Sequence, residues 1–155
     1  MFAITEPSSL TQARCSAIEY LARREHASLE LRNKLARKGF EQSVIDCVLI
    51  QLRADKLLSD ERFVECFVRS KTNKGYGPLR IQQELKRRGI GREMLTNVLD
   101  AGDSAWLKRA RLAQEKRFRD LPQNQREQAK QFRFLQHRGF TCSQIQAALS
   151  SDKDD

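Results

Sequence analysis

The sequence predicts an all-α protein, an elongated and curved array of three tandem three-helix repeats. Three observations support this fold class. Only 7% of the residues are aromatic, prolines number three and 32% of the residues are charged, a composition that favours short amphipathic helices over a sheet. Segments with a shared glycine recur every fifty residues, as LARKGF at 35–40, LKRRGI at 85–90 and LQHRGF at 135–140. Around these segments, apolar residues follow the helical period.

The recurrence defines three repeats, which we place at residues 1–55, 56–102 and 103–155. Apolar residues match at the same offset in all three: Leu35, Leu85 and Leu135; Ile45, Leu95 and Ile145; Leu49, Leu99 and Leu149. Three short helices bury little apolar surface, so each repeat is expected to depend on its neighbours. An array of this kind presents a long surface, which suits a polymeric partner better than a small molecule.

The first repeat begins with a predicted helix over residues 12–24, QARCSAIEYLARR. A second helix ends before Gly39, because a helix that finishes in the left-handed conformation usually has glycine just past its cap. The residue after such a glycine packs back onto the last turn, which predicts a contact between Phe40 and Leu35. A third helix follows, with one apolar face: Val44, Ile45, Val48 and Leu49.

The second repeat begins with a predicted helix over residues 59–74, with Ser59 as the N-cap. The stretch NKGYGPLRIQQELKRRGI follows. Its glycines do not form a nucleotide-binding loop, because the third glycine of a dinucleotide site and the Gly-Lys-Ser/Thr of a Walker loop are both missing. We interpret Gly77 as an N-cap and Pro78 as the first residue of the second helix, where its missing N–H costs nothing.

The third repeat begins with a predicted helix over residues 105–121. Pro122 either ends this helix or begins the next one. Thr141 and Gln144 have the spacing of a capping box, which predicts the start of the last helix. This repeat departs from the other two where Gln131 and Gln144 occupy positions that are apolar elsewhere.

Several classes of function are disfavoured. No apolar run approaches the roughly 18 residues of a membrane span and no signal pattern is present, so we expect a cytoplasmic protein without a membrane contact. The four cysteines are scattered, without a C-x-x-C pair, so we expect no metal and no cofactor. Cys47 and Cys66 lie among apolar neighbours, which predicts reduced thiols that pack as small hydrophobic side chains. No catalytic motif is found, which predicts that the protein is not an enzyme.

The net charge of +9 and the pI near 9.8 indicate an anionic partner, either nucleic acid or an acidic protein surface. The three repeats carry +1, +4 and +4. Between residues 69 and 92, Glu84 alone opposes eight cations: Arg69, Lys71, Lys74, Arg80, Lys86, Arg87, Arg88 and Arg92. A solvated helix face is the alternative, but we interpret this cluster as a binding surface. Tyr76 within it is a core residue, a partner contact or a stacking platform.

A second basic cluster lies on the first helix of the third repeat. Its members are opposed by Glu115 alone: Lys108, Arg109, Arg111, Lys116, Arg117 and Arg119. Trp106 stands nearby, and we interpret it as a packing anchor rather than a base-stacking residue.

The chain resembles the RecX regulatory proteins, bacterial modulators of the RecA recombinase. The resemblance rests on LLSDERFVECFVRSK, followed by NKGYGPLRIQQELKRRGI, and on three-helix units over essentially the whole chain. It implies a negative regulator that binds the RecA–DNA filament along its groove. Filament extension, ATPase, strand exchange and coprotease activity would be inhibited, which would modulate DNA repair, homologous recombination and the SOS response. We further expect a monomer, with weak non-specific contact to DNA.

By match to the family's central motif, Lys71, Lys74, Tyr76 and Arg80 are expected near the filament. The partner-binding set also includes the nearby basic residues Arg69, Lys86, Arg87 and Arg88, of which the last three are expected to add supporting charge. Gly39, Gly89 and Gly139 are expected to be structural. Charge reversal at Lys71, Lys74 and Arg80 is expected to weaken inhibition of RecA.

Two other interpretations remain open at this stage. Two helices joined by a glycine turn also describe a helix-turn-helix, so three such units and the positive charge are compatible with a direct DNA-binding protein. A helical-repeat adaptor that holds a peptide in an apolar groove is the second, and the high charge disfavours it.

Overall fold

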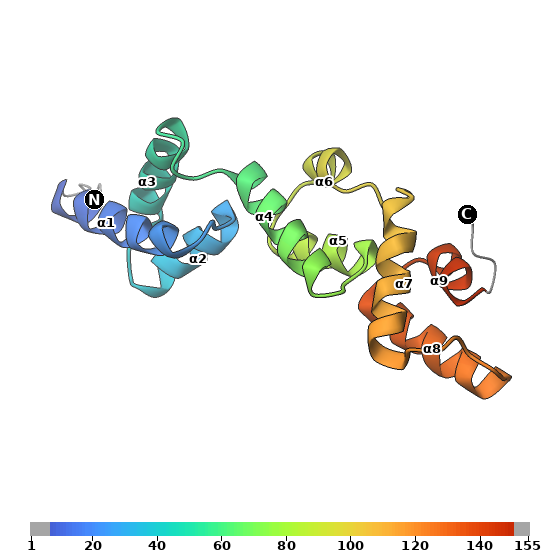
Figure 1. Cartoon of the computed structure of the whole chain (residues 1–155). Coiled ribbons are helices and arrows are strands. Elements are labelled where there is room, and N and C mark those ends of the chain that lie inside the picture. The colour runs from blue at the N-terminus through green and yellow to red at the C-terminus, as the bar shows by residue number, and fades with distance from the viewer. Residues whose placement is uncertain (1–6, 151–155) are drawn as a thin grey trace. The chain divides into compact units, whose positions relative to one another are not determined.

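A computed structural model describes residues 7–150, and within this range the chain forms α-helices and no strand (Figure 1). The helices are α1 (Pro7–Arg23), α2 (Ser28–Arg37), α3 (Gln42–Ala54), α4 (Asp60–Asn73), α5 (Pro78–Arg87), α6 (Arg92–Val98), α7 (Ala105–Phe118), α8 (Gln125–Arg138) and α9 (Cys142–Leu149). Each predicted repeat therefore contributes three helices in turn. The all-α class and the threefold repetition are confirmed.

The chain divides into two compact units. Among the described residues, unit 1 comprises 7–66 together with Arg88–Ile90, and unit 2 comprises Phe67–Arg87 and 91–150. The boundary falls inside α4, so the second repeat contributes to both units. The repeat limits at 55 and 102 stay a prediction.

Unit 1 has an apolar core formed by α1, α2 and α3. The helical period explains it, because the core residues recur on one face of each helix, although Ile18, Leu29 and Ile50 are exposed apolar residues on the outward faces. Its buried residues are Ala13, Ala17, Leu31, Leu35, Val44, Ile45, Val48, Leu49, Leu52 and Leu58. Tyr20 and Phe40 pack against its edge.

His26 is a buried titratable residue in unit 1, with 1% of its surface exposed. Its Nδ1 lies 3.0 Å from the Arg24 carbonyl oxygen, and the Lys34 ammonium lies 2.8 Å from Nε2. Because an ammonium can only donate, Nε2 must accept and Nδ1 must carry the proton. Burial lowers the pKa of His26, and the positive charges of Arg24 and Lys34 lower it further.

Unit 2 is built around the packing of α7 against α9 and α8. Trp106 is buried there, and its indole N–H donates to the Asp100 carbonyl oxygen at 2.9 Å. This confirms the interpretation of Trp106 as a packing anchor. Other buried apolar residues of the unit are Ile81, Leu85, Leu95, Leu99, Ala110, Leu135, Phe140, Ile145, Ala148 and Leu149.

The three repeated glycines adopt the left-handed conformation, with φ of 93° at Gly39, 80° at Gly89 and 99° at Gly139. In the first and third repeats the next N–H folds back onto the helix end: Phe40 to the Leu35 carbonyl at 3.4 Å, and Phe140 to the Leu135 carbonyl at 3.2 Å. This is the hydrogen bond of a Schellman motif. The predicted glycine turns are confirmed.

Helix starts also follow the sequence signals. The Ser59 hydroxyl accepts from the Arg62 N–H at 3.2 Å, Pro78 opens α5, and Thr141 forms a full capping box with Gln144. The prediction for Pro122 is wrong. α7 already ends at Phe118, and α8 starts after Asn124, whose side chain caps it, so Pro122 lies in the connection between them.

The prediction of packed thiols at Cys47 and Cys66 is also wrong, since both residues are exposed and free. In α3 the buried positions are 44, 45, 48 and 49, which leaves position 47 on the outward face. In α4 the buried residues are Phe63 and Val64, which likewise turn position 66 outward.

Candidate functional site

The start of α5 touches the α8–α9 turn through the backbone. The Gly77 N–H donates to the Arg138 carbonyl at 2.7 Å, and the Leu79 N–H donates to the Gly139 carbonyl at 2.9 Å. A Cβ on Gly77 would lie 2.5 Å from the carbonyl carbon of Gly139, so a side chain at position 77 cannot be accommodated without a shift. The structural interpretation of Gly77 and Pro78 is confirmed, with a packing reason that the sequence did not reveal.

Tyr76 stands beside this contact with three cations around its ring. The ring centroid lies 4.3 Å from Arg80 Cζ, 5.0 Å from Arg138 Cζ and 5.2 Å from Lys71 Nζ. All are within the range of a cation–π interaction. We call Lys71, Tyr76, Arg80 and Arg138 the Tyr76 cluster. Tyr76 is half-buried, and its ring contacts these three side chains of the protein itself.

Glu84 reduces the positive charge of the Tyr76 cluster. Its carboxylate lies 3.4 Å from Lys71 Nζ and 3.6 Å from Arg80 Nε. Arg80 also donates to the His137 carbonyl at 3.2 Å. These long side chains are therefore engaged inside unit 2, and they offer less charge to a partner than the sequence count suggests.

The other predicted partner-binding residues are placed differently. Arg69, Lys74, Lys86 and Arg87 are exposed, on or beside α4 and α5, and all belong to unit 2. Arg88 is half-buried and belongs to unit 1. Of the predicted residues in unit 2, the structure thus brings Lys71, Tyr76 and Arg80 together as one cluster and leaves the other four, all cations, exposed.

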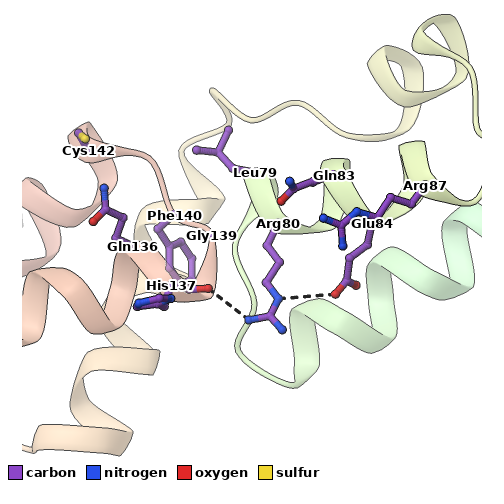
Figure 2. A pocket seen from close by; sticks show the side chains of 10 residues that line it. All are labelled: Leu79, Arg80, Gln83, Glu84, Arg87, Gln136, His137, Gly139, Phe140 and Cys142. Atoms are coloured by element: carbon purple, nitrogen blue, oxygen red, sulfur yellow. Dashed lines mark hydrogen bonds and ion pairs between the residues drawn. The ribbon is translucent and has the colours of Figure 1, made fainter.

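A groove of about 450 Å³ lies between α5 and the α8–α9 turn (Figure 2). Leu79, Gln83 and Arg87 line it from α5, and Gln136, His137 and Cys142 line it from the opposite side. Arg80 crosses from the α5 side to the His137 carbonyl, as the dashed line in Figure 2 shows.

Gln83, Gln136 and His137 were missed by the sequence reasoning. The helical period from Arg80 could have placed Gln83 and Arg87 on one face of α5. No signal in the sequence could bring Gln136 and His137 opposite that face, because this depends on how the second and third repeats dock.

The second basic cluster, on α7, is partly engaged with aromatic rings. Arg117 Cζ lies 5.2 Å from the Phe118 ring centroid and 6.0 Å from that of Phe134. Phe118 and Phe134 meet edge to face at 5.3 Å. Arg119, the C-cap residue that follows α7, has a φ of 66°. Lys108, Arg109 and Lys116 are exposed.

Residues 7–150 contain no group of three or more histidine, cysteine, aspartate or glutamate side chains that could hold a metal ion. None of the described helices has the length and apolar character that crossing a bilayer requires.

Comparison with protein families finds a match for each repeat. The model of the first three-helix domain of RecX matches residues 13–52, that of the second matches 59–99, and that of the third matches 105–149. The chain is 42% identical to the regulatory protein RecX of Halorhodospira halophila (strain DSM 244 / SL1), over 98% of this chain and 96% of that protein. It is 38% identical to the regulatory protein RecX of Vibrio campbellii (strain ATCC BAA-1116), over 90% of this chain and 91% of that protein.

Two solved structures share the fold. The crystal structure of RecX from Lactobacillus salivarius aligns with a TM-score of 0.80 and 20% identity, over 93% of this chain and 96% of that chain. A crystal structure of a regulatory protein RecX aligns with a TM-score of 0.76 and 23% identity, over 89% of this chain and 71% of that chain. At these identities the likeness concerns the fold alone.

Proposed function

The chain belongs to the RecX family of regulatory proteins, and on this premise we propose that it binds the RecA–DNA filament and lowers RecA activity. The matches to all three RecX domains support the proposal, because they span residues from 13 to 149. In this proposal the protein docks along the filament groove and restrains filament extension, ATP hydrolysis, strand exchange and coprotease activity. DNA repair and the SOS response would be modulated in the cytoplasm. The proposal includes no catalytic step and no cofactor.

Repetition suits this partner. A RecA filament repeats one subunit many times, and three similar helical units in series can contact successive subunits. Linked weak contacts gain avidity when their geometry lets them engage together. The net charge of +9 would speed the encounter with an anionic filament and make binding fall as salt rises.

Four exposed cations carry the proposed contact: Arg69, Lys74, Lys86 and Arg87. Lys71, Tyr76 and Arg80 support them from the Tyr76 cluster. Charge reversal at Lys71 or Arg80 would place a carboxylate beside Glu84 and perturb packing, so it is a poor test of partner contact.

The sharper test reverses exposed charges. We expect the triple variant Arg69→Glu, Lys74→Glu and Lys86→Glu to require about tenfold more protein for half-inhibition of the DNA-dependent ATPase of RecA, as three contacts of roughly 0.5 kcal/mol each predict. The matched control reverses three exposed cations of α8, Arg126, Lys130 and Arg133, which changes the net charge equally. Equal potency of the triple variant and the wild type would refute the site. A wild type that leaves RecA unaffected would refute the function.

A direct DNA-binding protein of helix-turn-helix type is the second candidate. It is favoured by the glycine turn that joins two helices in each repeat and by the positive charge. Titration of labelled single- and double-stranded DNA at physiological salt, with and without RecA, separates the two. Tight, sequence-specific binding without RecA supports this candidate, whereas weak and salt-sensitive binding does not.

A further inference from the structure

The groove between α5 and the α8–α9 turn contains polar side chains that are not used by the fold. Gln83, Arg87 and Gln136 line it and are exposed. Among the described residues, none forms a hydrogen bond or ion pair with these three side chains. The neighbouring Arg80 differs, because it is engaged by Glu84 and by the His137 carbonyl (Figure 2). Arg87 is therefore the cation in the groove that is available to a ligand.

The two glutamines indicate what kind of ligand fits. A carboxamide has one acceptor and two donor hydrogens, which match the C=O and N–H of an extended polypeptide. They come from opposite walls, Gln83 from α5 and Gln136 from α8, so a strand of peptide between them can bond to both. A phosphate chain offers acceptors only, and would leave the glutamine oxygens without donors.

Charge decides between a peptide and a nucleic acid in the same way. Glu84 also lines the groove and offsets part of the positive charge of Lys71 and Arg80, so the groove offers few unpaired cations to a continuous row of phosphates. A peptide can instead place one carboxylate at Arg87 and keep neutral groups beside Glu84. The guanidinium of Arg87 can hold that carboxylate with two parallel hydrogen bonds. The exposed Leu79, at 45%, offers an apolar contact at the rim.

We propose that this groove binds an extended segment of the protein partner that carries an aspartate or glutamate. Arg87 binds the carboxylate, while Gln83 and Gln136 bind the backbone of the segment. This inference rests on the proposed function, since the segment belongs to RecA in the filament. It assigns the groove to protein and leaves DNA contacts to other exposed cations.

Cross-linking from the groove tests the proposal. A photoreactive benzoylphenylalanine is placed at Cys142, an exposed residue that lines the groove and has no role in the proposed binding, and the full-length protein is irradiated with RecA filaments on single-stranded DNA. We expect cross-links to a RecA peptide that contains an acidic residue. Cross-links to DNA alone would overturn the inference. The absence of any cross-link would also overturn it, provided that the labelled protein still inhibits the ATPase of RecA.

Substitution of Arg87 gives the second measurement. Arg87→Glu and the milder Arg87→Gln should abolish the cross-link and raise the half-inhibitory concentration about tenfold for the first variant. Arg133→Glu, an exposed charge reversal on α8 outside the groove, is the matched control and should keep both. Circular dichroism checks that each variant is folded. Unchanged cross-linking in Arg87→Glu would overturn the inference, whereas loss of inhibition by the wild type itself would overturn the proposed function beneath it.

Discussion

The first and third repeats place different chemistry at equivalent buried positions. Leu31 in α2 and Val44 in α3 are buried in the first repeat. In the third repeat, two periods of fifty residues later, the corresponding positions are Gln131 in α8 and Gln144 in α9. Both are buried as well, with 5% and 9% of their surface exposed. One fold thus accepts an apolar core and a core that contains carboxamides.

The glutamines are tolerated because the connections between helices satisfy them. Gln114 Nε2 donates to Gln131 Oε1 at 3.0 Å, and both amides donate to the Asp120 carbonyl, at 2.9 Å and 3.2 Å. Gln144 donates to the Ala101 carbonyl at 2.7 Å. Buried polar groups cost little when they are paired, so the third repeat uses its core to fix two turns.

The repeated glycine gives the largest predicted difference. In all three variants, Gly→Ala forces alanine into the left-handed region, at a cost of about 1 kcal/mol. At Gly39 a Cβ meets nothing within 4 Å, but at Gly139 it would lie 2.4 Å from Arg80 Cβ and 2.6 Å from Arg80 N. Gly139→Ala should therefore cost about 3 kcal/mol, because overpacking against backbone adds to the strain.

Gly89 is the internal control for this series. Its Cβ would lie 2.8 Å from Leu29 Cδ2 and 3.0 Å from Leu29 Cβ, both in a side chain that is 40% exposed and has more room to move than the backbone of Arg80. Thermal unfolding should rank the melting temperatures as Gly39→Ala, then Gly89→Ala, then Gly139→Ala as the lowest. Equal losses at Gly39 and Gly139 would show that the close approach to α5 contributes nothing.

Exchange of the core residues should give the next largest effect. Leu31→Gln places a carboxamide in the core of unit 1, where Leu31 is fully buried among apolar residues, and should cost about 2 kcal/mol. Gln131→Leu should cost only about 1 kcal/mol, because the Asp120 carbonyl keeps its bond from Gln114. Urea unfolding followed by circular dichroism measures both. A greater loss from Gln131→Leu would mean that the amide network, not apolar burial, dominates this core.

Local signals were readable from the sequence, and contacts between repeats were not. The glycine period, the Ser59 cap and the Thr141 capping box each depend on a few neighbouring residues, and all three were predicted. The close approach of Gly77 to Gly139 depends on two segments about sixty residues apart. The contact of Arg80 with the His137 carbonyl depends on the same docking, and Arg80 also pairs with Glu84. The sequence therefore overstates the number of cations that are available to a partner.

The exposure of Cys47 and Cys66 could have been predicted from the sequence. Their outward position follows from the same helical period that identified Val44, Ile45, Val48 and Leu49 as the buried face of α3. Apolar neighbours in the sequence do not bury either cysteine. In a helix, adjacent residues point about 100° apart, so the period and not the local composition decides burial.

The smallest predicted difference between the first and third repeats is the loss of stability at acidic pH, which we expect from the first repeat. The first repeat buries His26 at the position where the third has the exposed Arg126. Because burial lowers the pKa of His26 below its usual 6.5, the unfolded chain binds the proton more readily. The contribution of the neutral His26 ring to the free energy of unfolding is fully present above pH 6.5. This contribution is lost as the pH falls below 6.5 toward the lower pKa of the folded state. Protonation would also place a positive ring beside the ammonium of Lys34, and the two charges would repel each other.

Urea unfolding between pH 5 and 7 should therefore show a free energy of unfolding that rises with pH. The variant His26→Gln, whose amide oxygen can still accept from Lys34, should flatten that slope. An identical slope in the variant would assign the pH dependence to other groups and leave His26 with a packing role alone.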